Sequence, residues 1–70
     1  MEFITVTIKD VKNTVPVLIN GQKNGFTGKI IKLNKGYVKI SADYPKVNTE
    51  EVYVSDTTIN KPTQVVLICS

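Results

Sequence analysis

Residues 15–41 read VPVLINGQKNGFTGKIIKLNKGYVKIS, and this stretch decides the fold class. Every second residue from Val15 to Ile19 is β-branched and apolar, which is the period of a strand with one buried face. Asn20-Gly21 and Asn24-Gly25 follow, and both pairs accept the positive φ of tight chain reversals. Two more apolar runs lie within residues 28–40. The stretch therefore predicts three consecutive strands that fold back on one another.

The flanking sequence predicts three further strands, over residues 1–8, 50–55 and 63–68. Valine, isoleucine, threonine and aromatic residues dominate them, which suits a pleated and half-buried surface. The residues predicted to point inward are Ile4, Val6, Ile8, Val15, Val17, Ile19, Ile30, Leu33, Val38, Ile40, Val52 and Val54. Ile30 and Leu33 break the period of two, so a bulge or strong coiling of the strand is expected between them.

The connections are predicted from turn residues. Gly21–Thr27 is expected to be a loop, and Asn34–Gly36 is expected to close a short hairpin. Pro16 cannot donate a ladder hydrogen bond, so its end of the strand is expected at a sheet edge. Ser55–Thr58 is expected to form a 3₁₀ turn, with Ile59 closing one end of the core. The glycines assigned to turns are Gly21, Gly25, Gly28 and Gly36.

The chain length limits the architecture to one small domain, residues 1–70. A domain of this size lies near the point at which a hydrophobic core only just outweighs chain entropy. No segment carries the apolar stripe of an amphipathic helix. Six short strands separated by turns therefore indicate a small all-β barrel or sandwich.

The residue types present argue against an enzyme. The chain has no histidine and a single cysteine, Cys69, which excludes serine or cysteine triads and most zinc sites. The acidic residues lack the fixed spacing of a calcium loop, so no metal or other cofactor and no small-molecule substrate is expected. No apolar run approaches the ~20 residues of a membrane span, and the first residues do not resemble a signal peptide. We expect a cytoplasmic protein that does not contact membranes.

Charge is unevenly placed along the chain. Residues 9–39 hold seven lysines against Asp10 alone, whereas residues 40–60 hold four acids against Lys46 alone. This asymmetry predicts either one basic side or lysines that only keep the sheet edges soluble. The chain contains no arginine, which argues against bidentate recognition of phosphates or bases.

Residues 15–41 resemble a KOW motif, the module of SH3-like barrels in NusG-type transcription factors and in ribosomal proteins. The likeness rests on the apolar alternation, on Asn20-Gly21, on Gly25 at the position of the motif's glycine, and on Tyr37-Val38-Lys39-Ile40. It extends to Ile59, and it implies an SH3-like barrel of five to six short antiparallel strands. The strand at residues 1–8 is additional to the motif. The resemblance further implies binding to RNA or nucleoprotein of the transcription or translation machinery, without catalysis.

Two binding hypotheses follow, and the sequence leaves both open. In the first, Tyr37, Lys39 and Tyr53 share an outer sheet face with Lys23 and Lys29 nearby, so that tyrosines stack on RNA bases and lysines neutralise phosphates. The alternative for the same tyrosines is that their rings only cover a small barrel.

In the second hypothesis an edge strand pairs with another chain, as expected for a phage-type or regulatory protein that binds a protein partner. Residues 3–8 and 65–68 are the candidate strands, the latter because both of its faces are apolar. A homodimer formed through residues 65–68 is one form of this hypothesis.

Overall fold

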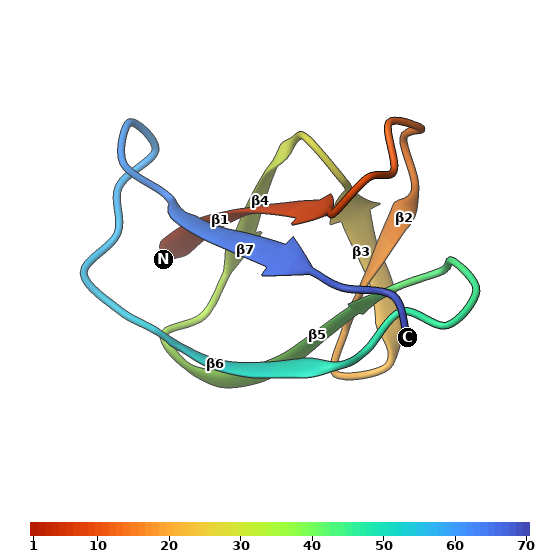
Figure 1. Cartoon of the computed structure of the whole chain (residues 1–70). Helices are drawn as coiled ribbons and strands as arrows, with labels where there is room; N and C mark the ends of the chain where they lie inside the picture. Colours follow the sequence, from red (N-terminus) through yellow and green to blue (C-terminus); the bar gives the residue numbers. More distant parts are fainter.

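The computed structural model describes residues 1–70 and contains seven strands and no helix (Figure 1). The strands are β1 (Glu2–Ile8), β2 (Pro16–Ile19), β3 (Gln22–Phe26), β4 (Ile30–Leu33), β5 (Gly36–Ala42), β6 (Glu50–Val54) and β7 (Thr63–Leu67). The prediction of a small all-β domain is confirmed. Since the chain forms no helix, it has no helix that could span a membrane.

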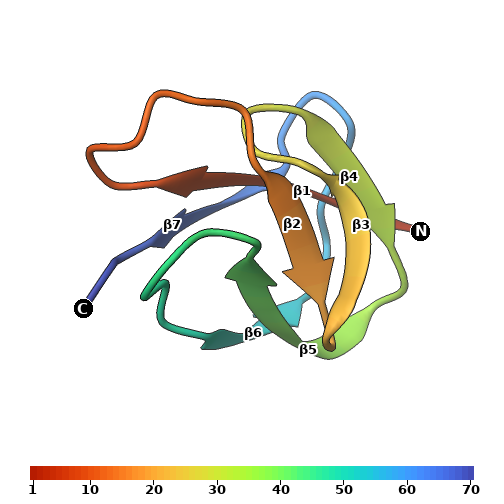
Figure 2. The ribbon, with the colours of Figure 1, turned by 90° about the vertical axis from the view of Figure 1, so that its right-hand side faces the viewer.

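The strands form two sheets with separate hydrogen-bond ladders. One has the order β4-β1-β7 and the other has the order β3-β2-β5-β6. The two sheets wrap around one core, as in a small barrel, but no closed barrel of continuous hydrogen bonding is formed. They approach each other where β3 and β4 lie side by side (Figure 2).

Two details of the predicted barrel are wrong. The strands number seven, where five to six were expected, and β1 pairs with β7 in the parallel direction, where only antiparallel strands were expected. Parallel neighbours need a long crossover connection. β1 and β7 stand near opposite ends of the chain, so β4 and the whole of the second sheet lie within that connection.

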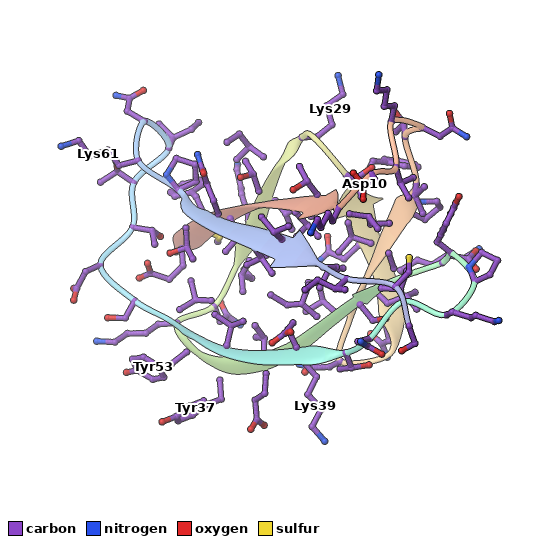
Figure 3. All side chains as sticks on the ribbon, in the orientation of Figure 1. Asp10, Lys29, Tyr37, Lys39, Tyr53 and Lys61 are labelled. Carbon is purple, nitrogen blue, oxygen red and sulfur yellow. The ribbon has the colours of Figure 1, made fainter.

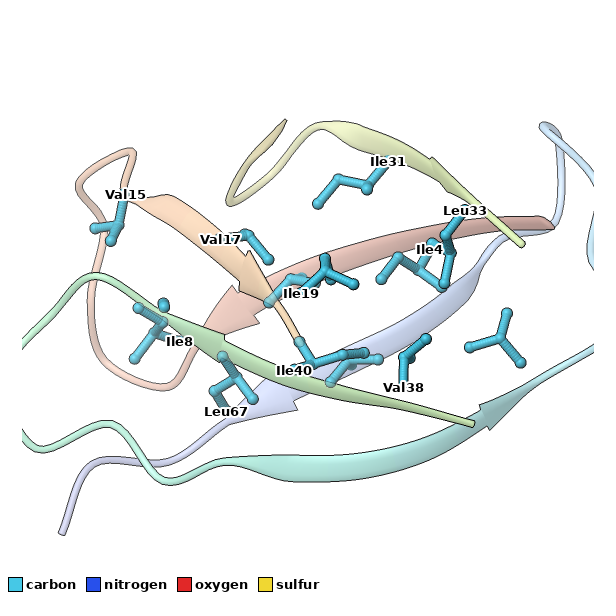
Figure 4. Packing of buried hydrophobic residues seen from close by; sticks show 14 residues of the cluster. Ile4, Ile8, Val15, Val17, Ile19, Ile31, Leu33, Val38, Ile40 and Leu67 are labelled. Carbon is cyan, nitrogen blue, oxygen red and sulfur yellow. The ribbon is translucent and has the colours of Figure 1, made fainter. Parts of the chain in front are cut away.

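Fourteen buried hydrophobic side chains fill the space between the sheets (Figure 4). They are Ile4, Val6, Ile8, Val15, Val17, Ile19, Ile31, Leu33, Val38, Ile40, Ala42, Val54, Val65 and Leu67. Within each strand, most of the buried residues are every second residue, because successive side chains of a strand point to opposite faces of the sheet. Fully burying such side chains contributes roughly 1.5–3 kcal/mol each to the driving force for folding.

The segment predicted as the loop Gly21–Thr27 contains a strand, β3. All five of its residues are exposed, so no apolar alternation marked it in the sequence. β3 exists because a two-residue turn reverses the chain after β2: Asn20 has φ 52° and Gly21 has φ 83°. Positive φ at both central residues matches the twist of an antiparallel hairpin.

The residues of β4 that point into the core also differ from the prediction. Ile31 and Leu33 are buried, while Ile30 is 43% exposed, so β4 keeps a regular period of two without the expected bulge. The approach of β3 explains the burial of Ile31. A Cβ built on Gly25 would lie 2.7 Å from Ile31 Cγ1, so the β4 side chain packs against the bare glycine backbone.

The connections after β4 and β6 differ from the prediction as well. Asn34–Gly36 does not close a hairpin, because β4 pairs with β1 while β5 pairs with β2 and β6. The segment instead carries the chain from one sheet to the other. Ser55–Thr58 forms no 3₁₀ turn, and Ile59 is 57% exposed, so it does not close the core.

Two predictions about special backbone residues have different outcomes. Pro16 does not lie at a sheet edge, because β2 stands between β3 and β5. It is the first residue of its strand, next to a register shift against β3, and the first position of a strand tolerates a missing N–H. All four glycines assigned to turns have positive φ.

Candidate functional site

The outer face of the four-stranded sheet carries the aromatic and charged residues that the sequence singled out. Tyr37 and Lys39 lie on β5, and the β6 residues directly opposite them are Tyr53 and Glu51. These side chains point away from the core because the alternate residues Val38 and Ile40 are buried (Figure 3). The prediction that Tyr37, Lys39 and Tyr53 share one outer face is confirmed.

Tyr37 and Tyr53 form a contacting aromatic pair at this surface. Their ring centroids are 4.8 Å apart with an interplanar angle of 58°, and their exposures are 73% and 52%. The backbone N–H and C=O of Lys39 both form hydrogen bonds to Asn20, on the side of β5 that faces β2. Tyr37 is two residues earlier, so its backbone groups face β2 as well, and the Tyr37–Tyr53 pair is a non-hydrogen-bonded pair of the antiparallel ladder. Side chains approach most closely in such pairs, which brings the two rings together. The result is an exposed pair of tilted rings, Tyr37 and Tyr53, which is called the platform below.

Asn20 fixes the position of Lys39 beside this platform. The Lys39 N–H donates to Asn20 Oδ1 at 2.9 Å, and the Asn20 N–H donates to the Lys39 carbonyl at 2.8 Å. Asn20 therefore continues the β2 ladder beyond the end of the strand, using a side-chain oxygen. Sequence reasoning recognised Asn20 as a turn residue and missed this second function. An Asn-Gly pair at the end of a strand was the only signal.

An open depression of about 650 Å³ lies beside Tyr37. Its lining residues are Leu18, Asn20, Gly21, Tyr37, Val38, Lys39, Ser41, Thr49 and Glu51. Lys39 and Glu51 stand opposite each other in the ladder, so this depression carries one positive and one negative side chain. Its chemistry suits a ligand that combines flat apolar surface with hydrogen-bonding edges.

Lys23 and Lys29 do not join the platform. Lys23 lies opposite Leu18 and so shares the outer face of this sheet, but it is on β3, two strands away from Tyr37 on β5, and its Nζ is 3.7 Å from Asp43 Oδ2. Lys29 follows β3 in the turn toward β4, and Figure 3 places it on the side of the molecule opposite Tyr37 and Tyr53. The five residues predicted from the sequence thus divide into a clustered set and two separate lysines.

Outside this sheet face, Cys69 and Glu2 are the groups with notable chemistry. No group of three or more His, Cys, Asp or Glu side chains is close enough to hold a metal ion, and Cys69 is a half-buried free thiol. Glu2 has a carboxyl group whose pKa is lowered by its surroundings. Hydrogen bonds from the Thr57 hydroxyl and backbone N–H lower the pKa of Glu2 below its ordinary value. Glu2 is buried and points inward, away from the platform.

Searches of protein-family models, of curated proteins and of solved structures find no match to this chain. No family is identified by these comparisons, and the resemblance to the KOW motif stays a prediction.

Proposed function

We propose that this chain is a small cytoplasmic, non-enzymatic module that binds single-stranded RNA through Tyr37, Tyr53 and Lys39. The observation that carries the proposal is the exposed Tyr37–Tyr53 pair on an open sheet face. Unstacked RNA bases bind aromatic side chains that are exposed on a sheet face. The KOW-like pattern supports a place in transcription or translation nucleoprotein.

The tyrosines and the lysine contribute to binding in different ways because their chemistry differs. Stacking on an exposed tyrosine contributes about 1–3 kcal/mol per base and tolerates any base, because every base has a flat π face. Lys39 attracts the backbone as a point charge without reading sequence. Glu51 opposite Lys39 weakens that attraction, so stacking supplies most of the affinity at this site.

The test is fluorescence anisotropy with a labelled single-stranded RNA of about ten nucleotides, a length within the range of small β modules. Tyr37→Ala and Tyr53→Ala are each expected to weaken binding by about 1–3 kcal/mol, while Tyr37→Phe keeps the ring and most of the affinity. Tyr44→Ala is the matched control, because Tyr44 lines a separate depression with Cys69. Equal affinities for the wild type, Tyr37→Ala and Tyr53→Ala would contradict the proposal.

A second candidate function is pairing of β7 with another chain. β7 is the edge strand of its sheet, with β1 as its only ladder partner. Val66 on β7 and Ile68 directly after it are 56% and 51% exposed. An edge strand with exposed apolar side chains is a template for strand addition. The partner would be a second copy or a host protein.

A further inference from the structure

A second depression lies on the other side of Tyr37. Its volume is about 540 Å³, and it lies between the β2–β3 hairpin and the segment that links β4 to β5. Its polar lining residues are Asn20, Asn24, Lys32, Asn34, Lys35 and Tyr37. Neither lysine belongs to the cluster predicted from the sequence.

The two depressions meet at Tyr37. Asn20, Tyr37 and Val38 line both of them, so the Tyr37 ring stands at their common border. A strand stacked on Tyr53 and Tyr37 can therefore continue past Asn20 without leaving the surface. Asn20 Oδ1 is held by the Lys39 N–H, which leaves the Asn20 Nδ2 donors for a ligand at this border.

The second depression differs from the first in its charge. No carboxylate lines it, whereas Glu51 lines the first. Lys35 does influence one acid, Glu2, whose pKa it helps to lower after the larger effects of the Thr57 hydrogen bonds. The one salt bridge of the chain joins Lys23 to Asp43, so the ammonium groups of Lys32 and Lys35 form none.

This combination of side chains matches a nucleotide. Ammonium groups bind a phosphate as point charges. An asparagine amide offers both a donor and an acceptor, which is the pattern presented by the edge of a base. A carboxylate-free depression with two lysines and three asparagines, adjoining an aromatic platform, offers both kinds of contact together.

We propose that the second depression is a nucleotide subsite of the same RNA-binding surface. The phosphate lies at Lys32 and Lys35, and the base edge contacts the amides of Asn24 and Asn34. This inference rests on the proposed function, since the bound strand reaches the subsite from the tyrosine platform. The platform accepts any base, and the subsite adds the sequence preference that stacking alone does not provide.

The test compares two matched double variants. Asn34→Ala with Lys35→Gln removes groups of the subsite, while Lys12→Gln with Asn13→Ala removes the same two residue types from the loop before β2. All four residues are exposed, so thermal melting of both variants should match the wild type. Affinity is measured for single-stranded RNA of about three and about six nucleotides.

We expect the subsite variant to bind the longer RNA at least about fivefold more weakly than the control variant does. The shorter RNA, which the platform alone accommodates, should bind both variants equally. In ¹⁵N correlation spectra, the side-chain amide signals of Asn24 and Asn34 should shift only with the longer RNA.

The remaining outcomes separate the two proposals. If Tyr37→Ala weakens binding while the subsite variant binds the longer RNA like the control, the subsite is overturned and the platform stands. If the subsite variant binds the shorter and the longer RNA more weakly by the same factor, the subsite proposal is also overturned. If no RNA binds the wild type, both proposals fail.

Discussion

The carboxylate of Glu2 accepts hydrogen bonds from both the hydroxyl and the backbone N–H of Thr57, 55 residues further along the chain. The N–H···O distance is 2.8 Å, and the same Thr57 hydroxyl oxygen accepts the Phe3 N–H at 2.8 Å. These contacts attach the start of β1 to the connection between β6 and β7, and so join the two sheets at one end of the core.

The contact between Glu2 and Thr57 predicts that the folded chain is less stable in acid. The hydrogen bonds favour the ionised carboxylate and hold the pKa of Glu2 below its ordinary value of 4.5 in the folded chain. A carboxyl whose pKa is lower when folded contributes stability that is fully present above the unfolded value. That contribution is lost as the pH falls through the folded pKa. Thermal melting temperatures should therefore decline below about pH 5, and more weakly in Glu2→Gln. Parallel pH profiles for the two proteins would contradict this assignment.

The contact between Gly25 and Ile31 predicts different costs for two alanine substitutions. Gly25 and Gly28 have similar φ values, 76° and 78°, so alanine is strained at both. Only at Gly25 would the new Cβ meet another side chain, at 2.7 Å from Ile31 Cγ1. We expect Gly25→Ala to lower the free energy of unfolding by about 1–3 kcal/mol more than Gly28→Ala, the usual cost of overpacking. Urea denaturation of both variants measures the difference, and equal costs would refute it.

The positions of Lys39 and Lys29 predict different effects on the salt dependence of RNA binding. With Lys32, Lys35 and Lys39 on the bound strand, log K should fall against log salt with a slope of about −2. Lys39→Gln should reduce this slope by about 0.7, the value for one phosphate of a single strand. Lys29→Gln should leave the slope unchanged because Lys29 lies on the opposite side of the molecule. A larger effect from Lys29 than from Lys39 would place the binding surface elsewhere.

The exposed side chains of Val66, on β7, and of Ile68, directly after it, predict self-association through that strand. If β7 pairs with a second copy, the wild type should sediment as a dimer at high micromolar concentration. Val66→Lys should then yield a monomer, because it places a charge in the interface. Ile59→Lys is the control, since Ile59 is similarly exposed, at 57%, but lies outside the strands. A monomeric wild type would leave only pairing with a different protein.

The sequence by itself determined those strands in which buried and exposed side chains alternate. Ile4, Val6 and Ile8 predict β1 and its buried face, and Val38 and Ile40 do the same for β5. A side-chain period of two reports directly which residues a sheet removes from water. The shared face of Tyr37 and Lys39 follows from the same rule, so the aromatic part of the candidate site was predictable. The positive φ of the turn glycines was predictable as well, because few other residues adopt it.

The tertiary structure decided which strands become neighbours. β3 is exposed throughout and has no apolar signal, and only its pairing with β2 makes it a strand. The burial of Ile31 instead of Ile30 depends on the bare backbone of Gly25 across the interface between the sheets. Lys29 and Tyr37 are close in sequence but separated in space, because residues 34–35 carry the chain from one sheet to the other. Pairing and packing of this kind join distant residues, whereas periodicity records only the local alternation of buried and exposed side chains.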